Sequence, residues 1–224
     1  MAASMTGNLE LVKQRIAAAA KRAGRDPAEV TLVVVGKGQP PGLLKALYDR
    51  GHRDFGENRA QELVVKVDEM PADVRWHFIG PLQTNKVRLV RPVVTLLHSF
   101  DRLDLAPAWM KGPGLPPPVM VQVNVGNEPQ KHGIAPETTR VVVDELTTMG
   151  VPVRGLMAIP PLAHDPEESR GYYQRMAMLL AELRTAHAQL SGLSMGMSDD
   201  FEVAVEEGAT FLRVGRAIFG STEH

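Results

Sequence analysis

The chain has 224 residues, a formal net charge of −1 at pH 7, 44% hydrophobic residues and no cysteine. This length and apolar content fit one large α/β domain or two small ones. The near-neutral charge provides no field that would recruit nucleic acid or an anionic membrane, and the lack of cysteine excludes disulfides and thiol chemistry. With no signal-peptide pattern and no membrane-length apolar run, we expect a cytoplasmic protein.

Apolar segments alternate with helical patterns along the whole chain. An alanine-rich helix is predicted at 9–23, with Gly24 as its C-terminal cap. The predicted strands are 32–35, 53–56, 76–79, 94–98, 119–125, 154–159, 193–195 and 211–214. The helices between them are predicted at 42–49, 58–68, 84–90, after Asp101 as cap, and at 136–148, 167–190 and 199–207, with a short one at the end.

About eight alternations of strand and helix predict a closed (β/α)8 barrel, as a single domain over 1–224. An open doubly wound sheet is the alternative, because an error at one boundary can merge or split an element. The stiff segment at 112–118 (GPGLPPP) is interpreted as a loop, since a strand-like run follows at once.

A lysine follows the first predicted strand directly. Lys37 lies between Gly36 and Gly38, at a rim where the backbone can turn tightly. If an apolar wall surrounds the amine, its pKa falls and the neutral form can make a Schiff base with an aldehyde. The plain alternative is a solvated lysine in a loop.

The ends of the last two strands are typical of a phosphate site. Ser198 and the Gly215-Arg216 turn each precede a helix, whose N-terminus presents unpaired N–H groups. The loops after strands 7 and 8 commonly bind phosphate in this fold, and closure places strand 8 beside strand 1. A ligand with both an aldehyde and a phosphate satisfies both features, and pyridoxal 5′-phosphate is one. The alternative for Ser198 is an ordinary helix N-cap.

Strand alternation points Arg213 to the same side as Gly215. An arginine there could face the ring nitrogen of such a ligand. Because a guanidinium does not give up its proton, it would leave that nitrogen unprotonated. The alternative is an ion pair with a carboxylate inside the barrel mouth.

Other polar and sulfur-containing side chains near the strand ends have structural interpretations. His77 is either a base or a satisfied inner-face histidine, and we favour the second. Met195 and Met197 are expected to pack in the core. Glu128 and Lys131 are expected to form an ion pair at the rim.

Seven motifs in this order together resemble the pyridoxal phosphate homeostasis protein family, also called the YggS/PROSC family: VVVGKGQP, FGENRAQEL, WHFIGPLQTNKV, VQVNVGNEPQKHGI, GLMAIPP, LSMGMSDDFEVAVEEGAT and RVGRAIFG. The resemblance implies a barrel of the alanine racemase type with its cofactor on Lys37. It also implies phosphate contacts from Ser198 and the Gly215 and Arg216 amides, Arg213 at the pyridine nitrogen, and Asn58 near the ring.

The chain departs from the family pattern at the lysine. Related sequences usually have Ser-Lys-Thr-Lys-Pro where this chain has Gly36-Lys37-Gly38-Gln39-Pro40, so two hydroxyls and a second lysine are replaced. Relatives also often have threonine in place of Arg216. A contact through the backbone amide survives that change, whereas a contact through a hydroxyl does not.

The leading functional hypothesis is a pyridoxal phosphate carrier or buffer in vitamin B6 homeostasis, with cofactor-dependent apoenzymes as possible recipients. An amino-acid racemase is the alternative, but two-base racemisation needs a second acid/base opposite the lysine. The tyrosines Tyr48, Tyr172 and Tyr173 all fall in predicted outer helices. A Schiff-base aldolase is a third possibility, with His77 as its acid/base group. We expect a monomer, or at most a weak dimer, because barrel racemases complete their sites across subunits with an extra domain that the motifs do not include.

Overall fold

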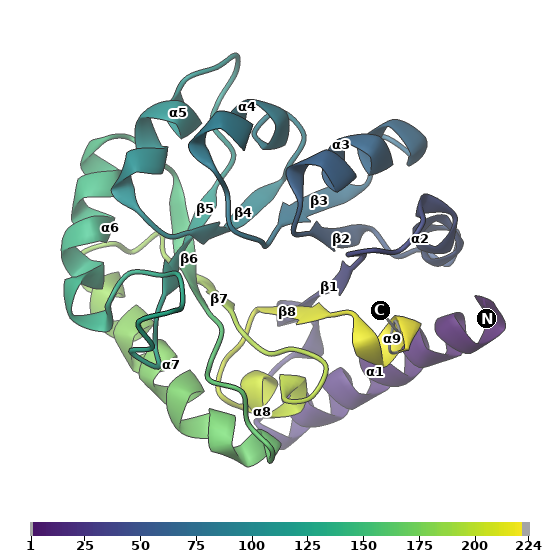
Figure 1. The fold of residues 1–224 in the computed structure, drawn as a ribbon. Coiled ribbons are helices and arrows are strands. Elements are labelled where there is room, and N and C mark those ends of the chain that lie inside the picture. Colours follow the sequence, from purple (N-terminus) through teal and green to yellow (C-terminus); the bar gives the residue numbers. More distant parts are fainter. Residues whose placement is uncertain (1, 221–224) are drawn as a thin grey trace.

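The computed structural model describes residues 2–220, which form a closed barrel of eight strands paired in sequence order (Figure 1). Every neighbouring pair is parallel. The predicted barrel is therefore confirmed, and the open sheet is wrong. Within the described residues, no helix has the length and apolar character needed to cross a membrane.

The strands are β1 (Thr31–Val35), β2 (Asp54–Glu57), β3 (Arg75–Phe78), β4 (Leu96–Phe100), β5 (Val119–Val123), β6 (Val153–Ala158), β7 (Gly192–Ser194) and β8 (Phe211–Val214). The helices are α1 (Ala2–Arg22), α2 (Pro41–Tyr48), α3 (Ala60–Glu69), α4 (Val87–Val90), α5 (Ala106–Met110), α6 (Thr139–Thr148), α7 (Arg170–Arg184), α8 (Phe201–Glu206) and α9 (Arg216–Phe219). Short 3₁₀ turns lie at Pro27–Glu29, Thr84–Lys86, Leu103–Leu105, Pro136–Thr138 and Pro166–Ser169.

The seam between β8 and β1 closes the barrel. Thr31 lies opposite Phe211, and Val34 lies opposite Val214. On the outside, α1 runs along α8 and α9 (Figure 1), and Asn8 Nδ2 donates to the Ile218 carbonyl at 3.0 Å. The first helix thus covers the last elements of the chain and holds its two ends together.

Apolar side chains form two cores. The large core lies between the strands and the surrounding helices. A small core fills the inside of the barrel, and its members are Val33, Leu96, Met120, Met157 and Phe211. The barrel interior also contains polar residues, which connect this core to the carboxyl end of the strands.

Most element predictions hold, with differences at ends and caps. Gly24 caps α1 as predicted: its φ is +66° and its N–H donates to the Lys21 carbonyl at 3.1 Å. The predicted strand at 94–98 lies at Leu96–Phe100 instead. Asp101 is not a helix cap; it accepts from Arg102 Nη1 at 2.7 Å, an ion pair that takes its carboxylate away from the helix.

The helix predicted at 167–190 is shorter in the structure. It begins as a 3₁₀ turn, and its α-helical part ends at Arg184. There the Thr185 hydroxyl donates to the Glu182 carbonyl at 2.7 Å, and His187 Nε2 contacts Asp144 Oδ1 of α6 at 2.5 Å. These side-chain hydrogen bonds compete with further helical hydrogen bonds and end the helix at Arg184. The helical spacing of apolar residues in the sequence continues past this point, which is why the predicted helix is too long.

We predict that Gly155→Ala destabilises the barrel. Gly155 of β6 pairs with Gly192 of β7, and a Cβ at Gly155 would lie 2.0 Å from the Gly192 carbonyl oxygen. Forcing these strands apart should lower the free energy of unfolding by about 1–3 kcal/mol or more, measured by urea denaturation. Gly171→Ala in α7 is the control, because nothing lies within 4 Å of its Cβ position. A Gly155→Ala protein as stable as this control would contradict the close approach of the strands.

Candidate functional site

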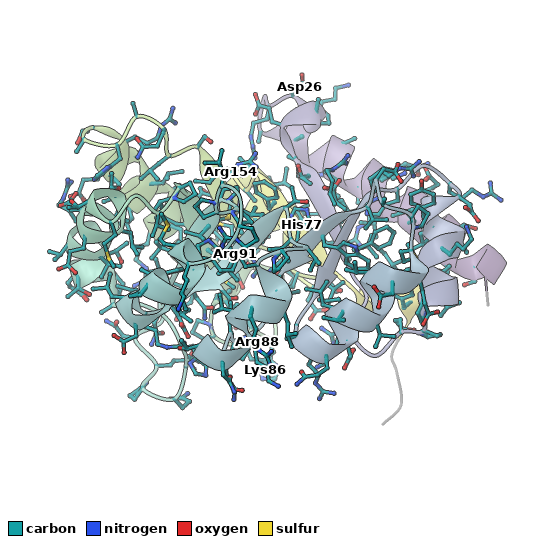
Figure 2. All side chains as sticks on the ribbon, turned by 90° about the horizontal axis from the view of Figure 1, so that it is seen from above. Asp26, His77, Lys86, Arg88, Arg91 and Arg154 are labelled. Atoms are coloured by element: carbon teal, nitrogen blue, oxygen red, sulfur yellow. The ribbon has the colours of Figure 1, made fainter. Side chains whose placement is uncertain are left out.

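The six predicted site residues lie on four neighbouring strands of the barrel. Lys37 follows β1, Asn58 follows β2, Ser198 follows β7, and Gly215 and Arg216 follow β8. The sixth, Arg213, lies within β8. Figure 2 shows which end of the barrel this is: Asp26, before β1, and Lys86, after β3, lie at opposite ends of the molecule, with His77 of β3 between them. Because the strands are parallel and closed, the structure brings the six residues to the carboxyl end of β7, β8, β1 and β2.

Lys37 lies in a turn just beyond β1 and its side chain is exposed. Within residues 2–220, no hydrogen bond or ion pair engages its amine. The condition of an apolar wall around the amine is therefore not met, and the lysine is solvent-exposed in its loop, as the alternative had it. What the position offers is an accessible primary amine at the rim.

The loops after β7 and β8 are joined by Ser198. Its Oγ accepts from the Ala217 N–H, in the first turn of α9, at 3.2 Å. Arg216 pairs with Asp199 of the β7 loop. Since α8 begins at Phe201 with a different residue as its N-cap, the alternative that Ser198 is a plain helix cap is wrong. The two loops form one cradle with a hydroxyl and main-chain N–H groups.

The β7 loop is held from behind by Asp200, which sequence reasoning missed. Asp200 Oδ1 accepts from the Met197 N–H at 2.8 Å. Its Oδ2 accepts from Ser169 Oγ at 3.0 Å and from the Tyr173 hydroxyl at 2.6 Å. Burial and then the nearby charge of Asp200 raise the pKa of Tyr173, so its hydroxyl remains a donor. The second aspartate of the SDD motif was the available signal, but nothing in the sequence links it to a tyrosine on α7.

Arg213 is buried inside the barrel, with 4% of its surface exposed. Its Nη1 donates to Ser194 Oγ at 2.5 Å, and its Nη2 donates to the Ala158 carbonyl at 2.9 Å. These partners are neutral oxygens, so the predicted alternative of an ion pair is wrong for the described residues. Burial lowers the pKa of Arg213 to about 10, which leaves the guanidinium charged at neutral pH.

A chain of hydrogen bonds runs through the barrel from Arg213. His98 Nδ1 lies 2.7 Å from Ser194 Oγ, and His98 Nε2 lies 2.9 Å from His77 Nδ1. His77 Nε2 lies 3.1 Å from Asp54 Oδ1. This arrangement confirms the interpretation of His77 as a satisfied inner-face histidine. Asp54 is the first residue of β2, so the chain reaches the opposite end of the barrel from the six site residues.

The carboxylate of Asp54 sets the positions of the hydrogens in this chain. Burial raises its pKa, but hydrogen bonds from Arg75 and His77 outweigh that effect and hold the pKa well below its usual value. A carboxylate only accepts, so His77 Nε2 carries the hydrogen. Burial lowers the pKa of both His77 and His98, which keeps them neutral. His98 therefore also carries its hydrogen on Nε2, and Ser194 donates to His98 Nδ1.

The remaining predictions at this end are partly confirmed. Glu128 and Lys131 form the expected ion pair, with 2.5 Å between Oε2 and Nζ. Met195 is fully buried in the core as expected. Met197 is only partly buried and lines a cavity of about 180 Å³ at the mouth, together with Lys131 and Ile159. The prediction that Met197 packs in the core is therefore wrong.

Pyridoxal phosphate fits the groups that meet here. Lys37 supplies a primary amine, and the Ser198–α9 cradle supplies donors for a phosphate. Asn58 Oδ1 and Glu57 Oε2 are buried without a hydrogen-bond partner among the described residues. Buried polar atoms without partners are uncommon in folded proteins, so the end of β2 has unused acceptor capacity for a ligand. Within residues 2–220 no cluster of side chains fit to hold a metal ion is found.

Sequence comparison agrees with the fold. Residues 7–223 match the family described as alanine racemase, N-terminal domain. The chain is 41% identical over 222 residues to the pyridoxal phosphate homeostasis protein of Aquifex aeolicus, covering 96% of this chain and 97% of the relative. It is 39% identical over 227 residues to the protein of the same name from Escherichia coli, covering 97% and 96% of the two chains.

Solved structures give the same assignment. PipY of Synechococcus elongatus, solved with pyridoxal phosphate bound, is 33% identical with a TM-score of 0.77, covering 93% of this chain and 100% of PipY. Alanine racemase from Corynebacterium glutamicum is 14% identical with a TM-score of 0.78, covering 99% of this chain and 62% of the racemase, and shows the fold alone. The chain thus belongs to the pyridoxal phosphate homeostasis protein family, within the alanine racemase N-terminal domain class.

The hydrogen-bond chain predicts the state of two histidines. His77 and His98 should both be neutral at neutral pH, with hydrogen on Nε2 and none on Nδ1. Long-range proton–nitrogen NMR on ¹⁵N-histidine-labelled protein measures this directly, with His77→Gln and His98→Gln variants for assignment. His187, whose imidazole contacts Asp144 on the outside, is the reference histidine. A hydrogen on Nδ1 of His98 would show that the hydrogen bonds run in the opposite direction.

Proposed function

We propose that this chain binds pyridoxal 5′-phosphate through Lys37 and acts in vitamin B6 homeostasis as a carrier or buffer of the cofactor. The observation that carries the proposal is the exposed Lys37 amine at the same end of the barrel as the Ser198–α9 cradle. Membership of a family whose relatives are named for pyridoxal phosphate homeostasis supports it, as does PipY with the cofactor bound.

Each site residue has a proposed role in binding. Bound pyridoxal phosphate supplies an aldehyde, which condenses with a primary amine with loss of water. Lys37 provides that amine. Ser198 and the main-chain N–H groups of Gly215 and Arg216 bind the phosphate, Arg213 faces the pyridine nitrogen, and Asn58 contacts the ring. Arg213 is proposed to donate a hydrogen bond to that nitrogen and leave it unprotonated, which weakens the ring as an electron sink.

A carrier is better supported than a racemase. The structure places Tyr48 in α2, where its hydroxyl donates to Asp73 at 2.5 Å, and places Tyr172 and Tyr173 in α7. Tyr173 is committed to Asp200 behind the β7 loop. His77 is committed to His98 and Asp54 inside the barrel, which also disfavours its use as the acid/base group of an aldolase.

The partners follow from the carrier hypothesis. Apoenzymes that need pyridoxal phosphate are the proposed recipients. The proposed location is cytoplasmic, because a doubly charged phosphate ester does not cross a bilayer unaided and must be handed over in the compartment where it is used. We also propose a monomer, since all the site residues named above come from one barrel.

Borohydride trapping tests the attachment site. Protein incubated with pyridoxal phosphate and reduced with borohydride should carry a pyridoxyl mass on the peptide that contains Lys37. Lys37→Ala should abolish that mass and the visible absorption band of the loaded protein, measured by peptide mass spectrometry and spectroscopy. Attachment at Lys86 or Lys131 instead, with Lys37 unmodified, would disprove the assignment.

Proton exchange separates the carrier from a racemase. In deuterated water, the loaded protein should exchange the α-proton of alanine or serine slowly and without inversion. A missing general acid/base commonly lowers a rate by about 10²–10⁴-fold, and the unprotonated ring adds to this. The measurements are NMR of α-deuteration and chiral chromatography of the amino acids. Rapid exchange with inversion that disappears in Lys37→Ala would make the protein a racemase.

A further inference from the structure

The turn that carries Lys37 has a defined conformation. The Gln39 N–H donates to the Gly36 carbonyl at 2.9 Å, which closes a four-residue turn with Lys37 second and Gly38 third. Gly38 has φ of +68°, while Lys37 is not among the residues with positive φ. This combination is a type II turn, whose third position favours glycine. The glycine at 38 therefore matches the turn.

Two side chains of α3 hold the peptides on both sides of Lys37. Lys66 Nζ donates to the Gly36 carbonyl, in the peptide before Lys37, at 2.7 Å. Glu62 Oε2 accepts from the Gly38 N–H, in the peptide after Lys37, at 3.1 Å. Residues 62 and 66 are one helical turn apart, and their charged groups lie 3.8 Å from each other. One face of α3 thus contacts the main chain immediately before and after the lysine.

A buried carboxylate fixes the lysine of this pair. Lys66 Nζ lies 2.5 Å from Glu57 Oε1, with side-chain exposures of 5% and 0%. A Cβ on Gly36 would lie 2.8 Å from Glu57 Oε1 and 2.9 Å from Leu44 Cδ2. Glycine at position 36 therefore leaves the space that this arrangement occupies. Both glycines around Lys37 agree with a turn held through its main chain.

We propose that Glu62 and Lys66 are positioning residues that hold the main chain of Lys37, so that its amine projects from a fixed point toward the bound cofactor. The inference rests on the proposed function, because it assigns these residues a role in attachment at Lys37. A flexible side chain that starts from a fixed turn samples fewer positions than one on a mobile loop. The two residues should therefore affect covalent attachment, and should not affect binding of the phosphate or ring.

The test compares two ligands. Pyridoxal phosphate has the aldehyde, whereas deoxypyridoxine phosphate has the same ring and phosphate with a methyl group in place of the aldehyde. In Glu62→Leu and Lys66→Met, the rate of attachment of pyridoxal phosphate should fall about tenfold or more, while the affinity for deoxypyridoxine phosphate stays within about twofold. Glu62→Gln keeps an acceptor for the Gly38 N–H and should restore the rate.

Two control variants are measured with the same two ligands. Glu69→Leu removes an exposed carboxylate from the end of the same helix and should change neither measurement. Ser198→Ala should weaken binding of both ligands. Unchanged attachment in both Glu62→Leu and Lys66→Met, or an equal loss of affinity for both ligands, would overturn the proposal. Failure of the unsubstituted protein to attach pyridoxal phosphate at Lys37 would instead overturn the proposed function.

A measurement without cofactor tests the contact itself. Hydrogen exchange followed by NMR should show a protected Gly38 amide in the unsubstituted protein and in Glu62→Gln. The same amide should exchange at least about tenfold faster in Glu62→Leu, while amides of the barrel strands keep their protection. Equal protection of Gly38 in all three proteins would show that Glu62 does not hold the turn, and would overturn the proposal whatever ligand the protein binds.

Discussion

The pairing of β8 with β1 is the constraint on which the rest of this structure depends. The two strands are far apart in the sequence, yet Val33 faces Arg213 and Val34 faces Val214 in register. A closed parallel barrel has no free edge, so this single pairing completes the main-chain hydrogen bonding of the sheet. It also carries the turn at Lys37 next to the loop that begins α9, so that candidate site residues from β1 and β8 lie side by side.

Closure also buries polar side chains inside the barrel, and these must find hydrogen-bond partners there. A buried polar group left without a partner costs about 1–3 kcal/mol, and Arg213, His77 and His98 are all buried. The hydrogen-bond chain matches each donor to one acceptor and ends at Asp54, beside the half-exposed Arg75. With a pure donor at one end and a carboxylate at the other, only one arrangement of hydrogens satisfies every group.

Helices that pack outside the barrel hold the loops at its rim through hydrogen bonds. Side chains of α3 contact the turn at Lys37, and Tyr173 of α7 reaches Asp200 behind the β7 loop. The first turn of α9 donates to Ser198. A site supported by regular elements is more precise than one that depends on loops alone. Contacts from several helices therefore hold this rim in place, and the Lys37 side chain is exposed there.

The sequence by itself determined the fold class, the order of the elements and the positions of the site residues on them. These depend on short-range patterns: apolar runs, helical spacing, and glycines where the chain turns. Repeated strand–helix units allow few architectures, and motifs such as FGEN and GMSDD mark the family. The expected rim positions of Lys37, Ser198 and Gly215 needed only the rule that parallel strands end on one side of a barrel.

Only the tertiary structure decided what these residues contact. The sequence left open whether Ser198 is an ordinary helix N-cap, and whether Arg213 meets a carboxylate. It carried no sign that Lys66 would bind the Gly36 carbonyl or that His98 would meet Ser194. These contacts join residues that lie 30 and 96 positions apart. Hydrogen-bond partners are selected by distance and burial in the folded chain, and neither is encoded in a local pattern of residue types.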